Sequence, residues 1–214
     1  MDKIKVSSVV VICVLMISLL NTYSAEYTPD LVPGLSDNWY HYNQGMEHLS
    51  NRAFNGALKE FDYYSGKAGH RHMMGVSHFG KGLTYQAMGN LGAALQEFKM
   101  AIDNDLHPAV PIADKAYMNI GAIYMKQKDY YEAIKAYEHA VHKNTQNGEA
   151  HYFLGMAYLK NGEIEKAEKE SEEAKKLGVL YTALDEKLKE AKNSHVNNRE
   201  KPYRKKSKKK QGDD

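Results

Sequence analysis

Residues 116–143 read AYMNIGAIYMKQKDYYEAIKAYEHAVHK, two stretches with apolar residues at helical spacing that are interrupted once, at residues 128–129. Residues 150–176, AHYFLGMAYLKNGEIEKAEKESEEAKK, repeat the same pattern. Gly121 and Gly155 occupy the same place in the two copies and lie 34 residues apart. A period of this length is typical of a stacked array of helical units.

A helical glycine followed twelve positions later by an alanine marks each copy of the pattern. The four pairs are Gly45 and Ala57, Gly82 and Ala94, Gly121 and Ala133, and Gly155 and Ala167. Glycine inside a helix costs about 1 kcal/mol relative to alanine, so its recurrence at one register indicates that a partner helix approaches closely there. We therefore predict helical hairpins in which each glycine faces the alanine of the second helix. Large residues fill the seam around this crossing, at Tyr85, Tyr124, Tyr158, Phe61, Phe98 and Tyr137.

The chain resembles the tetratricopeptide repeat family, whose template is W-x2-L-G-x2-Y followed by A-x3-F. The third copy matches best, with Tyr117, Ile120, Gly121, Tyr124, Ala133, Tyr137 and Ala140. The fourth copy has Ser171 in place of the aromatic residue, and the second has Lys81 at an apolar position. Three copies place a histidine at the tryptophan position, where a buried ring is the simplest interpretation; they are His41, His78 and His151. The resemblance implies an all-α fold, a right-handed superhelical array of helix-turn-helix hairpins.

The predicted organisation places four repeats in residues 36–178. Their approximate limits are 36–69, 72–104, 114–144 and 148–178. An extended leader at 26–35 is predicted before the repeats, and a capping helix at 179–195 and a disordered basic tail at 196–214 are predicted after them. Gly178 is expected to end the last repeat, and Thr182 with Asp185 resembles a capping box. The apolar stripe of Leu184, Leu188 and Ala191 is expected to cover the open end of the array.

Two connections between repeats are longer than the 34-residue period requires. Gly45 and Gly82 are 37 residues apart, and Gly82 and Gly121 are 39 apart, so the added residues fall in 66–75 and 103–114. They form either surface loops or a longer start to the following helix, with Pro108 or Pro111 at its first position.

Residues 1–25 have the layout of a secretory signal peptide: Lys3 and Lys5, an apolar run, and then small polar residues. The run at 9–20 is twelve residues long, short of the roughly 20 that cross a bilayer. Cleavage and export to the periplasm or cell envelope are therefore predicted, with an uncleaved membrane anchor as the alternative. Cys13, the single cysteine, lies in this run, so the mature chain has no disulfide, thiol nucleophile or cysteine-bound metal.

The resemblance implies that function lies in a concave groove formed by the first helix of each repeat. Its predicted lining is Trp39, Tyr42, Asn43, Met46, Val76, Phe79, Leu83, Lys115, Met118, Asn119, Met125, Tyr152, Phe153 and Met156. Methionine and aromatic side chains adapt to irregular apolar partners, so we predict a protein–protein interaction scaffold that binds an apolar or amphipathic peptide segment of an envelope protein. Occupation of the groove by the chain's own leader or terminal helix, and self-association, are the alternatives.

No catalytic residue, metal site or cofactor is predicted. Residues 75–80 miss the G-x-S-x-G pattern, because the second glycine comes one place late. The histidines and methionines of residues 70–78 suit copper, which makes a metal- or haem-handling periplasmic protein the alternative function. Between residues 25 and 198 the chain has 19 basic against 23 acidic residues, whereas 199–214 has 8 against 3. The basic tail would contact an anionic surface, and the export signal argues against nucleic acid as a partner.

Overall fold

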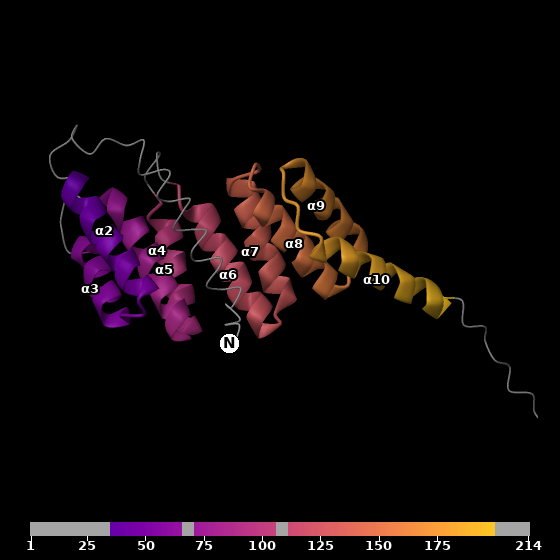
Figure 1. Ribbon diagram of the computed structural model, residues 1–214, viewed down its shortest axis with the longest axis horizontal. Helices are drawn as coiled ribbons and strands as arrows, with labels where there is room; N and C mark the ends of the chain where they lie inside the picture. The colour runs from indigo at the N-terminus through magenta and orange to yellow at the C-terminus, as the bar shows by residue number, and fades with distance from the viewer. Residues whose placement is uncertain (1–34, 66–70, 106–110, 200–214) are drawn as a thin grey trace, which may run out of the picture. The chain divides into compact units, whose positions relative to one another are not determined.

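The computed structural model describes residues 35–65, 71–105 and 111–199, which are helical apart from short connections (Figure 1). The helices are α2 (Leu35–Ser50), α3 (Phe54–Ser65), α4 (Arg71–Met88), α5 (Leu91–Asp103), α6 (Ala113–Gln127), α7 (Tyr130–Lys143), α8 (Gly148–Asn161), α9 (Ile164–Lys176) and α10 (Ala183–Arg199). The predicted all-α class of helix-turn-helix hairpins is confirmed. The predicted signal peptide and nearly all of the leader lie outside the described residues.

The chain forms two compact units, and each is described by itself. Unit 1 ends at Ile120 and unit 2 begins at Gly121, so the division falls within α6. In unit 1, α2 packs against α3, α3 against α4, and α4 against α5. In unit 2, α7 packs against α8, α8 against α9, and α10 against both α8 and α9. Neighbours in the chain are therefore neighbours in space within each unit, as expected for stacked hairpins.

One turn geometry joins the two helices of every hairpin. Seven residues after the helical glycine, the backbone enters the left-handed region, at Arg52 (φ 59°), Gly89 (φ 82°), Lys128 (φ 63°) and Gly162 (φ 87°). The next N–H then bonds back to the first helix; for example, Asp129 donates to the Tyr124 carbonyl at 3.0 Å. The side chains of Asn90 and Asp129 cap the second helix in two of these turns.

The helical glycines make room for aromatic rings. In unit 1, a Cβ atom on Gly45 would lie 2.6 Å from the ring of Phe61, and one on Gly82 would lie 2.6 Å from the ring of Phe98. In unit 2, a Cβ atom on Gly121 would lie 2.7 Å from the ring of Tyr137. The paired alanines are fully buried, but they are not the nearest neighbours of these three glycines. The expectation that each glycine faces an alanine is therefore corrected, because the missing side chain admits the ring of the second helix.

The fourth hairpin uses a different residue over its glycine. Ser171 stands where the other second helices have an aromatic residue, and it is too small to fill the space. Leu184 of α10 fills it instead: a Cβ atom on Gly155 would lie 2.8 Å from Leu184 Cδ2, and Leu184 is fully buried. The Ser171 hydroxyl donates to the Asp185 carboxylate at 2.7 Å, which ties α9 to α10. Helix α10 thus completes the last hairpin.

Helix α10 differs in detail from the predicted cap. It begins at Ala183 and continues to Arg199, beyond the predicted end at residue 195 and into the stretch assigned to the tail. Asp185 does not act in a capping box, since its carboxylate contacts Ser171 and Lys175 of α9, the latter at 2.7 Å. These two contacts lower the pKa of Asp185 although burial alone would raise it. Gly178 ends the repeat as predicted, with a φ of 84°.

The two long connections take different forms. The first lengthens the following helix, because α4 begins at Arg71, eleven residues before Gly82. The second is a connection, since α6 begins only at Ala113 and Pro111 precedes it. Asp105 ties the end of α5 to the start of α6: its carboxylate accepts from the N–H groups of Ile112 and Ala113 at 3.2 and 3.0 Å. Pro108 lies outside the described residues.

Two helical glycines should respond in opposite ways to replacement by alanine. In Gly82→Ala the new methyl group meets the Phe98 ring, and overpacking of this kind costs about 1–3 kcal/mol. In Gly92→Ala the nearest atom to the new Cβ is Asn90 Oδ1 at 4.0 Å, an ordinary contact, and the helix gains about 0.5 kcal/mol or more. Urea unfolding of both variants measures the two changes; equal effects would contradict the ring-over-glycine packing.

The cap should depend on Leu184 and not on the neighbouring apolar surface. Removing a fully buried leucine side chain costs about 2–5 kcal/mol, so Leu184→Ala should unfold the α8–α10 region at lower urea. Leu180→Ala is the control, because Leu180 is 84% exposed. Hydrogen exchange of the α8 and α9 amides reports the local effect, and unchanged protection in Leu184→Ala would refute the capping role.

Candidate functional site

The predicted groove residues of unit 1 divide into a buried and an accessible set. Tyr42, Val76 and Phe79 are 4%, 3% and 3% exposed. The Tyr42 ring packs on Phe61 and the Phe79 ring on Phe98, with centroids 5.8 and 5.7 Å apart. Burial raises the pKa of Tyr42 above its usual value. These three side chains therefore contribute to the packing of unit 1.

The accessible set of unit 1 lies on α2, α4 and α6. Half-buried side chains occupy the predicted positions Met46, Leu83, Lys115, Met118 and Asn119, and Asn43 is exposed. Trp39 lies in α2, but its side chain is outside the described ones. The side-chain amide of Asn119 donates to the Lys115 carbonyl at 2.8 Å. Apart from these amides and one lysine, this accessible set is aliphatic.

In unit 2 the predicted residues join a row of four aromatic rings. Tyr137 stacks on Phe153 at 5.9 Å, Phe153 meets Tyr152 edge-on at 5.3 Å, and Tyr152 meets Tyr181 at 5.0 Å. The row runs from the buried Tyr137 to Tyr181, which is 48% exposed. Burial, and then the nearby Tyr181 and Asp185, raise the pKa of Tyr152. Rings that keep this spacing form a preorganised apolar surface.

Tyr181 belongs to the connection between α9 and α10, so the chain itself covers part of Tyr152. Its hydroxyl donates to Glu149 at 3.4 Å, which holds the ring in place. Phe153, Met156 and Met125 are also half-buried. The structure thus brings Tyr152 and Phe153 together in unit 2. That the fourteen residues line one groove stays a prediction.

Histidine–glutamate pairs recur in three hairpins, a feature that the sequence reasoning missed. The Nδ1 atoms of the histidines lie 2.6–2.7 Å from glutamate Oε2 atoms nineteen residues later, in His41–Glu60, His78–Glu97 and His151–Glu170. The third copy has Tyr117 and Ala136 at the equivalent positions. Each pair joins the first helix of a hairpin to the second. The sequence did contain a signal for these pairs, since histidine and glutamate occur together in three copies and are both replaced in the third copy.

In unit 1, two polar residues that depart from the repeat template, His78 and Lys81, both have charged or hydrogen-bonding partners. His78 and Glu97 have side chains only 6% and 17% exposed, and Lys81 Nζ lies 3.0 Å from Asp62 and 3.8 Å from Glu97. Buried charges need such partners, which explains how Lys81 occupies a position that the template makes apolar. His78 is therefore engaged within the hairpin.

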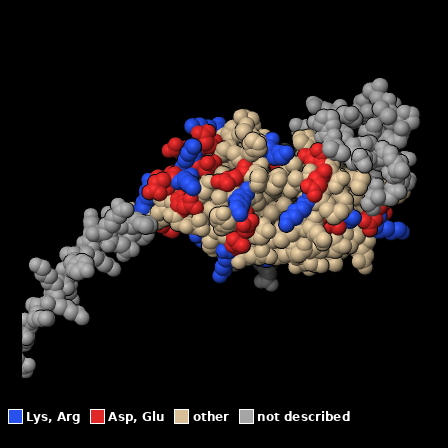
Figure 2. All heavy atoms as spheres, turned by 180° about the vertical axis from the view of Figure 1, so that it is seen from behind, with Lys and Arg blue, Asp and Glu red and all other residues tan. Residues whose placement is uncertain are grey.

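The residues described by the structure contain no group of three or more potential metal ligands among histidine, cysteine and acidic side chains. Of the histidines named for the alternative function, His70 lies outside the described residues and His72 has no described side chain. None of the described helices is long and apolar enough to cross a membrane. Acidic and basic side chains lie interspersed on the face shown in Figure 2.

These features define a class: a helical repeat protein whose four hairpins share one turn and whose first three share one ring-over-glycine contact. Tetratricopeptide repeat models match residues 79–147 and 124–177. The chain is therefore a tetratricopeptide repeat protein, a class whose repeats generally serve as interaction scaffolds without catalytic activity. Comparison with curated proteins gives no match.

Solved structures show the same fold. A crystal structure of MamA is 22% identical, with 71% of this chain and 84% of that chain covered and a TM-score of 0.59. The C-terminal part of a repeat-containing protein from Cytophaga hutchinsonii is 17% identical, with 89% and 69% covered and a TM-score of 0.63. At these identities the likeness is one of fold.

The buried His78–Glu97 pair should behave as a coupled unit. Removing one partner leaves a buried polar group unsatisfied, at a cost of about 1–3 kcal/mol, so His78→Tyr and Glu97→Ala should each destabilise the chain. The double variant copies Tyr117 and Ala136, and its loss should be smaller than the sum of the single losses by about 0.5–3 kcal/mol. Urea unfolding of all four proteins measures the coupling, and strict additivity would contradict it.

Proposed function

We propose that this tetratricopeptide repeat protein is an exported, non-enzymatic adaptor that binds an apolar or amphipathic peptide segment of an envelope protein. The fold is a protein–protein interaction scaffold. The single observation that carries the finer proposal is that each unit leaves apolar side chains half-buried on its first helices. In unit 1 these include Met46, Leu83 and Met118, and in unit 2 they include Tyr152, Phe153 and Met156.

The chemistry of these side chains supports a helical or extended apolar ligand. In the first three hairpins the ring of the second helix packs against the glycine of the first, and in the fourth hairpin Leu184 takes this place. The remaining apolar face gains free energy when a partner covers it, at about 25 cal/mol per Å² of buried apolar surface. Methionine fits several ligand shapes, because its unbranched side chain adapts easily. An amphipathic helix docked by such anchors is a recurrent mode of peptide recognition.

Export is part of the proposal and rests on the signal-like layout of residues 1–25. A partner in the cell envelope follows from it. The basic residues of 199–214 would add attraction to an anionic surface. The metal- or haem-handling alternative gains no support from His78, because that ring bonds to Glu97.

Matched methionine-to-lysine substitutions should test the adaptor function. Met118→Lys and Met156→Lys place a charge on the half-buried face of a first helix, and desolvating that charge should lower capture of a partner from envelope extracts by about tenfold or more. Met100→Lys is the control, because Met100 is 42% exposed on the second helix α5. Affinity capture with quantitative mass spectrometry, alongside thermal melting, measures the effect.

The proposal predicts that the captured protein comes from envelope extracts and not from the cytoplasmic fraction. Equal recovery by all three variants with unchanged melting would refute binding at the first helices. Tyr181→Ala distinguishes self-coverage, since uncovering Tyr152 should increase capture if the α9–α10 connection competes with the partner.

A further inference from the structure

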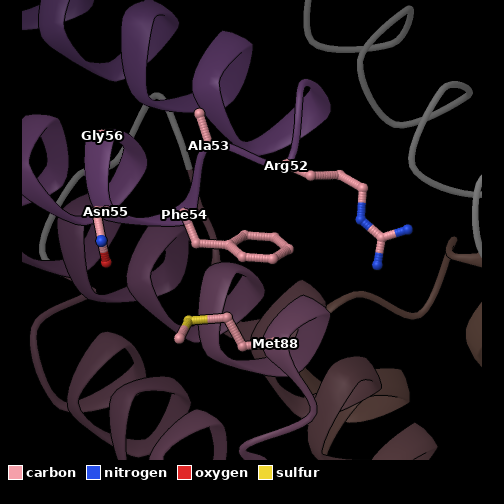
Figure 3. A pocket seen from close by; sticks show the side chains of 6 residues that line it. All are labelled: Arg52, Ala53, Phe54, Asn55, Gly56 and Met88. Carbon is pink, nitrogen blue, oxygen red and sulfur yellow. The ribbon is translucent and has the colours of Figure 1, made fainter.

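A pocket of about 480 Å³ lies at the turn end of unit 1 (Figure 3). It is formed by the turn between α2 and α3, the start of α3 and the end of α4. Its lining is Arg52, Ala53, Phe54, Asn55, Gly56 and Met88. None of these six residues belongs to the predicted groove, so the pocket is a separate feature of the hairpin turns.

The walls of the pocket expose apolar surface. Phe54 is half-buried and Met88 is 46% exposed. Figure 3 shows the Phe54 ring and the Met88 side chain facing the same space from different elements. An apolar side chain of a ligand placed between them would remove surface from water on both sides, which is the main source of binding free energy at such sites.

Arg52 supplies a cation at the edge of the same pocket. Its side chain extends past the Phe54 ring, away from the helices (Figure 3). Within the described residues its guanidinium has no ion pair or hydrogen bond, and none of the residues that line the pocket is acidic. Lys81 in the same unit is bound by Asp62 and Glu97. The charge of Arg52 is therefore available to a ligand.

The turn itself does not need the arginine side chain. The equivalent positions in the second and fourth hairpins are Gly89 and Gly162, which adopt the same left-handed conformation without a side chain. Lys128 occupies this position in the third hairpin, but it does not line the pocket. Replacement of Arg52 by glycine should therefore preserve the turn, and Lys128 provides a matched control.

We propose that this pocket binds a partner peptide in which an apolar side chain stands next to a carboxylate. The apolar group lies between Phe54 and Met88, and the carboxylate accepts two hydrogen bonds from the Arg52 guanidinium. The planar fork of arginine matches a carboxylate in this way. Arginine, aromatic and methionine side chains are also the residues that protein interfaces favour. Charge complementarity selects the acidic peptide over a neutral one of the same shape.

Titration of the full chain with a blocked Ala-Leu-Glu-Leu-Ala peptide tests the proposal. The chain is labelled with ¹³C-methyl methionine, and the NMR signal of the Met88 methyl group is assigned by its absence in Met88→Leu. This signal should shift saturably as the peptide is added. The matched peptide with glutamine in place of glutamate should bind about tenfold more weakly or worse, since a charge-assisted bond is lost. The Arg52→Gly variant should bind the acidic peptide with an affinity lowered by the same factor, and its melting temperature should be no lower than that of the parent. The Lys128→Gly variant should bind the acidic peptide with the parental affinity.

Equal affinity for the two peptides would overturn the proposal, as would parental binding by Arg52→Gly. The proposal would also be overturned if other methionine methyl signals shifted saturably while the Met88 signal did not move. The same holds if no methionine signal shifted at millimolar peptide. The result is independent of the groove, because Met118→Lys and Met156→Lys should leave the Met88 titration unchanged.

Discussion

The packing of an aromatic ring onto a bare glycine backbone is the contact on which each of the first three hairpins depends. Phe61, Phe98 and Tyr137 lie 2.6–2.7 Å from the places where Gly45, Gly82 and Gly121 would carry a Cβ atom. A ring in that space holds the two helices at a fixed separation, and the cost of glycine in a helix is offset by burial of the whole ring. The same contact fixes which face of each first helix is used inside the hairpin. Other side chains of the first helices stay half-buried, as at Met46, Leu83 and Met118, which is why a binding surface is expected there.

The end of the array follows from the same requirement. An open repeat needs a cap that covers its apolar face, and here the cap also supplies the missing ring contact. Leu184 of α10 occupies the space over Gly155 because Ser171 cannot. The small serine leaves room for a hydrogen bond to Asp185, so one substitution serves both the packing and the polar attachment of α10. The connection that leads into α10 then places Tyr181 against Tyr152, which links the cap to the candidate binding surface.

Electrostatic contacts supplement the apolar hairpins at sites where the repeat template expects a tryptophan. Three histidines there each bond to a glutamate on the second helix, and the third copy replaces both partners by Tyr117 and Ala136. A polar pair inside a hairpin is tolerated only when both members are satisfied, so the two positions vary together. This arrangement gives the histidines a structural role and leaves Arg52 of unit 1 as a cation with a pocket beside it.

The sequence alone determined the helical hairpins, their register and their turns, because glycine, alanine and aromatic residues recur at a fixed period that only helices can use. It also indicated a cap, since Leu184 and Leu188 form one stripe. Only the tertiary structure decided which side chains contact one another. Periodicity identifies the buried face of a helix but not the atoms across from it, so the ring above each glycine, the substitution of Leu184 for an aromatic residue and the histidine–glutamate pairs appeared only in three dimensions. For the same reason, the sequence could not show that Tyr42 and Phe79, predicted as groove residues from their helical positions, pack on Phe61 and Phe98. The pocket at Arg52 likewise arises from the α2–α3 turn and the end of α4, which are distant in the chain.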